Sequence, residues 1–244
     1  SKAQQPHVID VGGNIGWFSM FSMANGARVY TFEPNKANHY RACETICLND
    51  WDDEPCHVLG PIMAPTTAAK NVGQVEIFPI GIGATNDILT FRIDEKNPGT
   101  SKISHGKVTG KSELMREIQV MPLDYLRVDM GWDKVDIDIL KVDVEGLERD
   151  VFRGAVELLK SGRVKNIFME GNVARHQVKD FRETIAQLTG DGYKLYRLGG
   201  FEGPSGEYVA PEGVDATEGI VQKCSTSARG KHRNQCNIWW KLDK

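Results

Sequence analysis

Short apolar runs rich in β-branched residues alternate along this chain with segments of helical pattern. The runs include HVIDV, RVYTFE, IDILKVD and VKNIFME, and helical patterns such as KANHYRACETICLN and LERDVFRGAVELLK lie between them. Strands that alternate with helices form a mostly parallel sheet with helices on both faces, joined by right-handed crossovers. The pattern therefore predicts an α/β fold, and near the end of the chain YKLYRL and NIWWKL predict two neighbouring strands.

An acidic residue stands at the end of four of these predicted strands. The four residues are Asp10, Glu33, Asp143 and Glu170. Ligands of an open parallel sheet bind beyond the carboxyl ends of its strands. We therefore expect the functional site at this edge, where the four acids gather.

A glycine-rich turn follows the first predicted strand. Gly12, Gly13 and Gly16 permit a tight turn and a close approach of a ligand to the backbone. The spacing is G-x-N-x-G, which differs from the G-x-G-x-x-G of dinucleotide-binding folds. Asp10 directly upstream would repel a pyrophosphate, whereas Glu33 is placed to bind both hydroxyls of a ribose. The combination favours S-adenosyl-L-methionine, an adenosyl ligand that carries an amino acid and no phosphate.

Three stretches, VIDVGGNIGWFS, TFEPN and ILKVDVEGLERDVFRGA, resemble the FkbM family of S-adenosylmethionine-dependent methyltransferases. The resemblance runs from about His7 to Gly171, and its most specific part is Lys-x-Asp-x-Glu-Gly at Lys141 to Gly146. It implies a class I methyltransferase (Rossmann-like) fold, with a mostly parallel seven-stranded sheet and an antiparallel last strand. It also implies O-methylation of a hydroxyl on a sugar or another small-molecule acceptor.

The predicted site has a cofactor-binding part and a catalytic part. Asp143 is assigned to both, and the predicted chemistry needs no metal. The cofactor-binding candidates are Asp10, Gly12, Gly13, Asn14, Gly16, Glu33, Pro34 and Asp143, and the catalytic candidates are Asp143, Glu145, Lys141, Glu170 and His176.

Each catalytic candidate has a structural alternative. Asp143 and Glu145 would also stabilise the N-terminus of the helix that follows them, and together they would also suit a divalent cation. Lys141 either keeps these acids ionised or forms a structural ion pair. Glu170 either faces solvent or belongs to the site with His176, the histidine nearest to it.

The rhythm of strands and helices is interrupted at Asp50 to Gln74, at Asn97 to Glu117 and at Gly199 to Asn234. We predict one domain over residues 1–244, with insertions near 50–74 and 199–234. The last insertion is rich in Gly and Pro and contains four basic residues, which suits a lid or an acceptor-binding loop; the alternative is a disordered surface loop. The acid expected near the adenine is not adjacent to its strand, and Asp87 is the nearest candidate.

Composition excludes some partners and leaves others open. A net charge of −3 and a pI near 6.1 give no general attraction to nucleic acid or to membranes. No apolar run approaches the roughly 18 residues of a membrane span. Cys43 and Cys47 are expected to be packing residues, with a disulfide or ligand role as the alternative. Cys224 and Cys236 are candidates for a bridge in an oxidising compartment, which the sequence leaves open. Upstream sequence is expected to be missing, and a cytoplasmic location is the default expectation.

Three rival functions stay open. Lys141, Asp143 and Glu170 partly resemble the residues of RNA ribose 2'-O-methyltransferases, and nucleic acid is the second acceptor class after a small-molecule or glycan hydroxyl. A binding module would keep the cofactor pocket without catalysis. A nicotinamide dehydrogenase is third, because the glycine turn and Asp10 argue against NAD.

Overall fold

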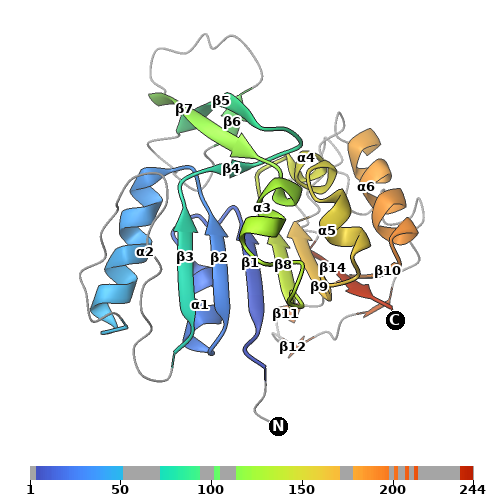
Figure 1. Ribbon diagram of the computed structural model, residues 1–244, viewed down its shortest axis with the longest axis horizontal. Coiled ribbons are helices and arrows are strands. Elements are labelled where there is room, and N and C mark those ends of the chain that lie inside the picture. The colour runs from blue at the N-terminus through green and yellow to red at the C-terminus, as the bar shows by residue number, and fades with distance from the viewer. Residues whose placement is uncertain are drawn as a thin grey trace.

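A computed structural model describes residues 4–51, 72–93, 102–104, 114–170, 178–197, 201–202, 207–208, 212–213 and 237–243 (Figure 1). Most of the two predicted insertions, near 50–74 and 199–234, lies outside these residues. Of the second insertion, the structure describes β11 (Phe201–Glu202), which pairs with β12 (Glu207–Tyr208), and the edge strand β13 (Glu212–Gly213).

The large sheet has the strand order β13-β10-β14-β9-β8-β1-β2-β3. The strands β1, β2, β3, β8 and β9 are parallel to their neighbours in this set, whereas β14 is antiparallel to both β9 and β10. The predicted α/β fold with a mostly parallel seven-stranded sheet and an antiparallel last strand is therefore confirmed, with the two-residue β13 added at one edge. Besides β13, the strands of this sheet are β1 (His7–Val11), β2 (Arg28–Phe32), β3 (Gln74–Phe78), β8 (Ile139–Val142), β9 (Asn166–Glu170), β10 (Tyr193–Arg197) and β14 (Asn237–Leu242).

Helices cover both faces of this sheet (Figure 1). On one face, α1 (Trp17–Ala24) and α2 (Lys36–Leu48) enclose an apolar cluster that contains Val8 of β1 and Val29 of β2. On the other face, Ile9 and Tyr30, the next residues of the same strands, join a larger cluster. This second cluster is covered by α3 (Leu123–Asp129), α4 (Glu148–Arg153), α5 (Val156–Lys160) and α6 (Val178–Gly190).

One predicted helix is two helices in the structure. The segment LERDVFRGAVELLK forms α4 and α5, with Gly154 and Ala155 between them. A Cβ atom on Gly154 would lie 2.0 Å from the carbonyl oxygen of Gly83, so only glycine allows this contact between backbones. The break therefore serves the packing of the two helices against the start of the second sheet.

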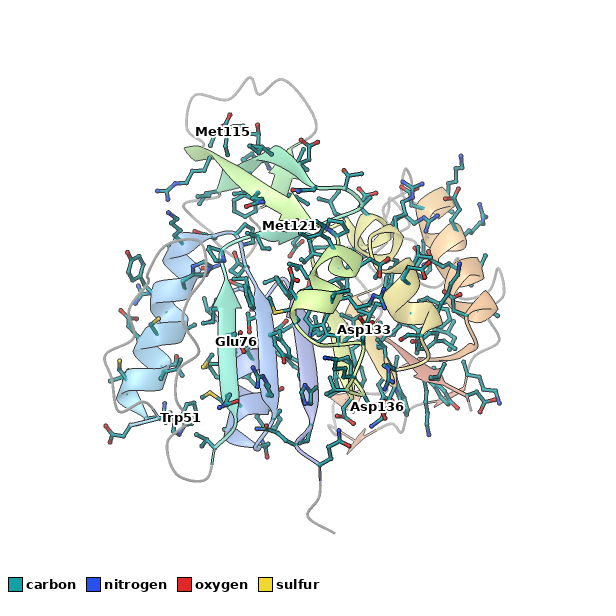
Figure 2. The ribbon with its side chains drawn as sticks, viewed as in Figure 1. Trp51, Glu76, Met115, Met121, Asp133 and Asp136 are labelled. Atoms are coloured by element: carbon teal, nitrogen blue, oxygen red, sulfur yellow. The ribbon has the colours of Figure 1, made fainter. Side chains whose placement is uncertain are left out.

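A second, four-stranded sheet was not predicted. It has the order β4-β7-β5-β6 and lies beyond the ends toward which β2 and β3 point (Figure 1). Met115 lies in the outer part of this sheet and Met121 lies where β7 meets the body of the molecule (Figure 2). The predicted interruption at 97–117 is therefore wrong in part, because it contains β6 and the start of β7. The strands are β4 (Gly81–Ile82), β5 (Asp87–Ile93), β6 (Lys102–Ser104) and β7 (Leu114–Met121).

The cysteines of α2 differ from the sequence expectation. Cys43 is buried in the cluster under α2, but it is also disulfide-bonded. Cys47 is free and exposed, so it is not a packing residue. Cys224 and Cys236 lie outside the described residues.

Candidate functional site

The pairing of strands brings three of the predicted acids to one edge of the sheet. In β1, Asp10 lies opposite Thr31 of β2 on one side and opposite Lys141 of β8 on the other. β1 thus lies between β2 and β8, and the segments that follow these two strands flank its glycine turn. Residues that are more than 100 positions apart in the sequence meet here.

The glycine turn is in close contact with β2 on one side and with the segment that follows β8 on the other. The amides of Gly12 and Gly13 both donate to the carbonyl oxygen of Phe32, at 2.9 and 3.1 Å. A Cβ atom on Gly12 would lie 1.8 Å from the carbonyl oxygen of Asp143, and one on Gly13 would lie 2.2 Å from Cγ2 of Thr31. Gly12 also has a φ of +83°, which favours glycine. The turn therefore requires glycine at both positions.

Asn14 and Gly16 complete this turn. Both have left-handed backbones, with φ of 49° and 85°, and Asn14 is exposed while Gly16 is buried. Gly16 is the N-cap of α1 and makes no side-chain cap. The first amides of α1 therefore lie beside the turn, where unpaired helix N–H groups suit an acceptor atom of a ligand.

Asp10 lies beneath the turn and has no exposed surface. One carboxylate oxygen accepts a hydrogen bond from Oγ of Ser19 at 2.5 Å, and the other is bonded by Nζ of Lys141 at 3.0 Å. Ser19 in turn bonds to Oγ1 of Thr31 at 2.6 Å. Both oxygens of Asp10 thus have partners inside the protein, and its predicted role in cofactor binding stays a prediction. Its geometry suits a residue that fixes the turn.

Lys141 links the turn to the catalytic candidates. Its ammonium donates to the carbonyl oxygen of Gly12 at 3.1 Å and lies 3.7 Å from a carboxylate oxygen of Asp143. Burial alone would lower the pKa of Lys141, but the charges of Asp10 and Asp143 outweigh burial and raise it. Lys141 therefore stays protonated at neutral pH and is unsuited to accept a proton.

Glu33 stands at the end of β2 and is 6% exposed. Its Oε2 accepts from the amide of Asn14 at 2.9 Å, and its Oε1 accepts from the amide of Asn35 at 2.8 Å. Burial raises the pKa of Glu33, and these two hydrogen bonds offset that effect only in part. The side chain of Asn38 also interacts with this carboxylate. Since a carboxylate has about four acceptor positions, one is left for a ligand hydroxyl. Pro34, the next residue, is half-buried.

Asp143 and Glu145 lie in the turn between β8 and α4. The amide of Asp143 donates to the carbonyl oxygen of Val11 at 3.0 Å, and its side chain is 41% exposed. Glu145 is exposed, with a left-handed φ of 54°. The N-cap of α4 is Leu147, which makes no side-chain cap. The helix thus begins after both acids, and neither occupies its N-cap position.

Sequence reasoning missed Glu148, the first residue of α4. Its Oε1 accepts from the amide of Gly146 at 3.0 Å, so the side chain folds back over the turn. Burial raises the pKa of Glu148, and the nearby charge of Asp143 adds to that rise. An acid in the first turn of a helix is an ordinary sequence signal, but only its partner in the structure separates it from Asp150, which follows two residues later.

The remaining candidates are Glu170, His176 and Asp87. β9 ends at Glu170, which is paired in register with Asn237 of β14, but the Glu170 side chain and the whole of His176 lie outside the described residues. Asp87, the candidate near the adenine, is the first residue of β5 in the second sheet. It lines a hollow of about 600 Å³ together with Glu117 and Gln119.

The described part of the chain contains no group of three or more His, Cys, Asp or Glu side chains placed to hold a metal ion. None of its helices is both long enough and apolar enough to cross a membrane.

The large sheet with its antiparallel β14, and the glycine turn after β1, define a class I methyltransferase fold. The chain belongs to the FkbM methyltransferase family, since the sequence model described as "Methyltransferase FkbM domain" matches residues 10–195. It is also 24% identical over 163 residues to "Methyltransferase 1" of Beauveria bassiana (strain ARSEF 2860). That match covers 60% of this chain and 57% of the relative, so the chain matches little more than half of that protein's length.

Two solved structures align with nearly the whole chain. The precorrin-6y C5,15-methyltransferase of Geobacter metallireducens GS-15 is 10% identical with a TM-score of 0.40, and the alignment covers 98% of this chain and 83% of that one. A SAM-dependent methyltransferase of Agrobacterium tumefaciens is 10% identical with a TM-score of 0.46, and the alignment covers 100% of this chain and 58% of that one.

Proposed function

We propose that this protein is an S-adenosyl-L-methionine-dependent O-methyltransferase that acts on a hydroxyl of a sugar or another small molecule. Membership of the FkbM family supports methyl transfer. The observation that carries the cofactor assignment is the Glu33 carboxylate, which is oriented by two backbone amides at the end of β2. The carboxylate keeps an acceptor position beyond these amides, and a ribose hydroxyl would match it.

The charge and shape of the turn fit the rest of this cofactor. Lys141 pairs with both Asp10 and Asp143, so one positive charge stands against two carboxylates and the remaining negative charge suits a positively charged ligand. The backbone of residues 12–16, with Glu33, Pro34 and Asp143, would hold the cofactor. When bound, S-adenosyl-L-methionine supplies a methyl group attached to a positively charged sulfur.

The residues of the chain then have to align the acceptor and remove its proton. Asp143 and Glu145 are the candidates for the proton acceptor, because both are carboxylates beside the turn and both have exposed surface. A well-placed general base contributes about 100- to 10,000-fold to such a reaction. Lys141 lies 3.7 Å from a carboxylate oxygen of Asp143, while Asp10 and Ser19 hold Lys141 and the turn in place.

Binding and turnover test this proposal in two steps. Isothermal titration with S-adenosylhomocysteine should show one site, and NAD should not compete for it. A screen of sugars and small alcohols with tritiated methyl donor should then give labelled product. Binding without product on any hydroxyl would leave only a binding module, and labelled RNA would favour a ribose methyltransferase. Absence of binding would contradict the proposal.

A further inference from the structure

The turn between β8 and α4 has an unusual backbone. Glu145 and Gly146 are consecutive residues with left-handed φ, at 54° and 101°. Such a conformation is unfavourable for a residue with a side chain, so it persists only where the surroundings hold it. Glu145 is thus kept in an orientation that the isolated segment would not favour.

Both ends of this turn are fixed by different elements. At its start, the amide of Asp143 is bonded to Val11 of β1, and the Asp143 carbonyl oxygen touches Gly12. At its end, the Glu148 carboxylate accepts the amide of Gly146 at 3.0 Å. The amide of Val144 also contributes a hydrogen bond to Glu148. The exposed acid Glu145 lies between these two anchors.

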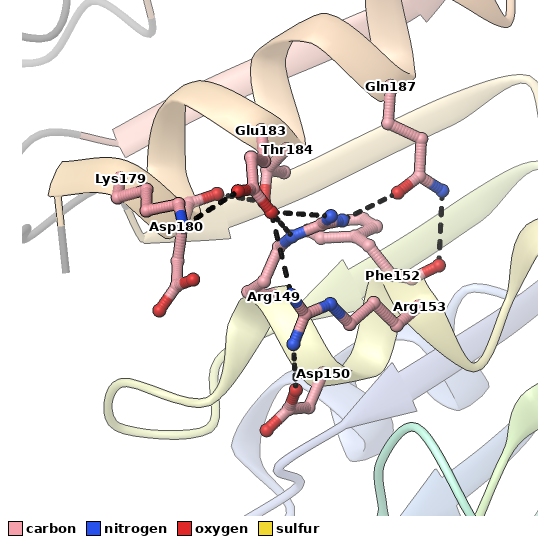
Figure 3. Close-up of polar contacts among 9 residues, drawn as sticks. All are labelled: Arg149, Asp150, Phe152, Arg153, Lys179, Asp180, Glu183, Thr184 and Gln187. Atoms are coloured by element: carbon pink, nitrogen blue, oxygen red, sulfur yellow. Dashed lines mark hydrogen bonds and ion pairs between the residues drawn. The ribbon is translucent and has the colours of Figure 1, made fainter.

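Glu148 belongs to α4, and hydrogen bonds fix this helix against α6. Arg149, the next residue, donates to Oε2 of Glu183 at 2.9 and 3.3 Å and to Oε1 of Gln187 at 2.9 Å, both on α6 (Figure 3). Gln187 returns a hydrogen bond to the carbonyl oxygen of Phe152 at 3.1 Å. Hydrogen bonds from Arg149 and to the Phe152 carbonyl oxygen therefore hold α4 against α6. They fix the position of the backbone from which the Glu148 side chain extends.

We propose that Glu148 is a positioning residue, which holds the turn at residues 144–146 so that Asp143 and Glu145 face the acceptor. The expected effect of Glu148 on turnover rests on the proposed methyl transfer. Its expected effect on the backbone of the turn does not. Glu148 takes no proton from the acceptor itself. Its carboxylate is occupied with backbone amides, whereas Asp143 and Glu145 lie closer to solvent.

Asp150 supplies a matched control. It is an acid in the same first turn of α4, but its partner is the surface residue Arg153, at 3.3 Å (Figure 3). Any general effect of negative charge near the N-terminus of the helix should appear equally in Glu148 and Asp150 variants. An effect on the turn should appear only at Glu148.

The first measurement is amide hydrogen exchange in Glu148→Ala, Glu148→Gln and Asp150→Ala. Exchange at Gly146 should be faster by about 10- to 100-fold in Glu148→Ala, which is the fold-change of one lost hydrogen bond to a charged group. Glu148→Gln should show a smaller rise, and Asp150→Ala none. If Glu148→Ala does not fold, Glu148→Gln carries the test. Unchanged exchange at Gly146 in a folded Glu148 variant would overturn the inference.

The second measurement is kinetic. Glu148→Gln should lower kcat about 10-fold or more while the affinity for S-adenosylhomocysteine stays within about twofold, since the cofactor contacts are elsewhere. Its pH–rate profile should keep the acidic limb, because the proton acceptor is still present. Loss of that limb would make Glu148 the base and refute its positioning role. If the wild type transfers no methyl to any acceptor, the proposed function fails, and hydrogen exchange alone decides on Glu148.

Discussion

Replacing Glu33 with glutamine tests the cofactor site at its most defined contact. The substitution keeps the shape of the side chain but turns one carboxylate oxygen into an NH₂ group, which cannot accept a hydrogen bond. Both oxygens now accept backbone amides, from Asn14 at 2.9 Å and Asn35 at 2.8 Å. One amide must therefore lose its partner, and one ribose hydroxyl must lose a charged acceptor.

The expected magnitude follows from that loss. A hydrogen bond to a charged group contributes about 1.5–3 kcal/mol. Since about 1.4 kcal/mol is a factor of ten, Glu33→Gln should weaken binding of S-adenosylhomocysteine by roughly 10- to 150-fold in isothermal titration. Glu76→Gln is the control, because Glu76 lies in the middle of neighbouring β3, where it pairs with Arg28 at 2.8 Å (Figure 2). A folded Glu33→Gln with wild-type affinity would refute the ribose assignment.

The same side chain predicts a pH dependence. Burial raises the pKa of Glu33 above 4.5, so the protonated acid favours the folded state. Its contribution to stability is fully present below the unfolded pKa, about 4.5, and is lost as the pH rises through the folded pKa. Cofactor binding has the opposite sign, because the ribose needs the ionised form. Affinity should therefore fall as the pH drops through the raised pKa, and titrations of Glu33→Gln should lack this dependence.

Further substitutions separate backbone constraints from chemistry. Gly12→Ala should abolish cofactor binding and lower the midpoint of thermal unfolding, because its Cβ would meet a carbonyl oxygen at 1.8 Å. Gly13→Ala should cost about 1–3 kcal/mol in denaturant unfolding, and Thr31→Ser should restore most of it by removing the Cγ2 atom in contact; no rescue would contradict that contact. Asp143→Asn and Glu145→Gln should lower turnover more than affinity for S-adenosylhomocysteine. If activity also disappears with EDTA, a divalent cation takes part; normal rates in both variants would exclude a catalytic role for the two acids.

The sequence predicted the large sheet better than the second one. Apolar runs such as NIWWKL stand out, and Trp240 is fully buried while its neighbour Trp239 is half-buried, as alternation along a strand requires. The apolar run VEIFPIGI spans two strands, β3 and β4, because Pro79 lacks an amide donor and the pairing passes to β7 after it. DILTFRI and REIQV alternate in the way of half-buried strands, and this signal for the second sheet was overlooked.

For the candidate site, the sequence predicted positions more reliably than roles. Asp10 was predicted at the end of β1, but its burial depends on Lys141, which is 131 positions away. No local pattern shows that partner, because the pairing of β1 with β8 creates it. Glu148 was missed for a related reason: its side chain acts on a turn whose left-handed backbone is visible only in three dimensions.

The burial of the Asp10 and Lys141 pair also bears on which nucleotide the turn accepts. Lys141 lies between Asp10 and Asp143, so its positive charge is already shared by two carboxylates. Dinucleotide folds place a pyrophosphate at the N-terminus of the first helix, and here Asp143 lies against the glycine turn that precedes this helix. Like charges repel each other in a partly buried site. A ligand with a positive centre would instead gain from Asp143, and this supports our proposal of a sulfonium cofactor rather than NAD.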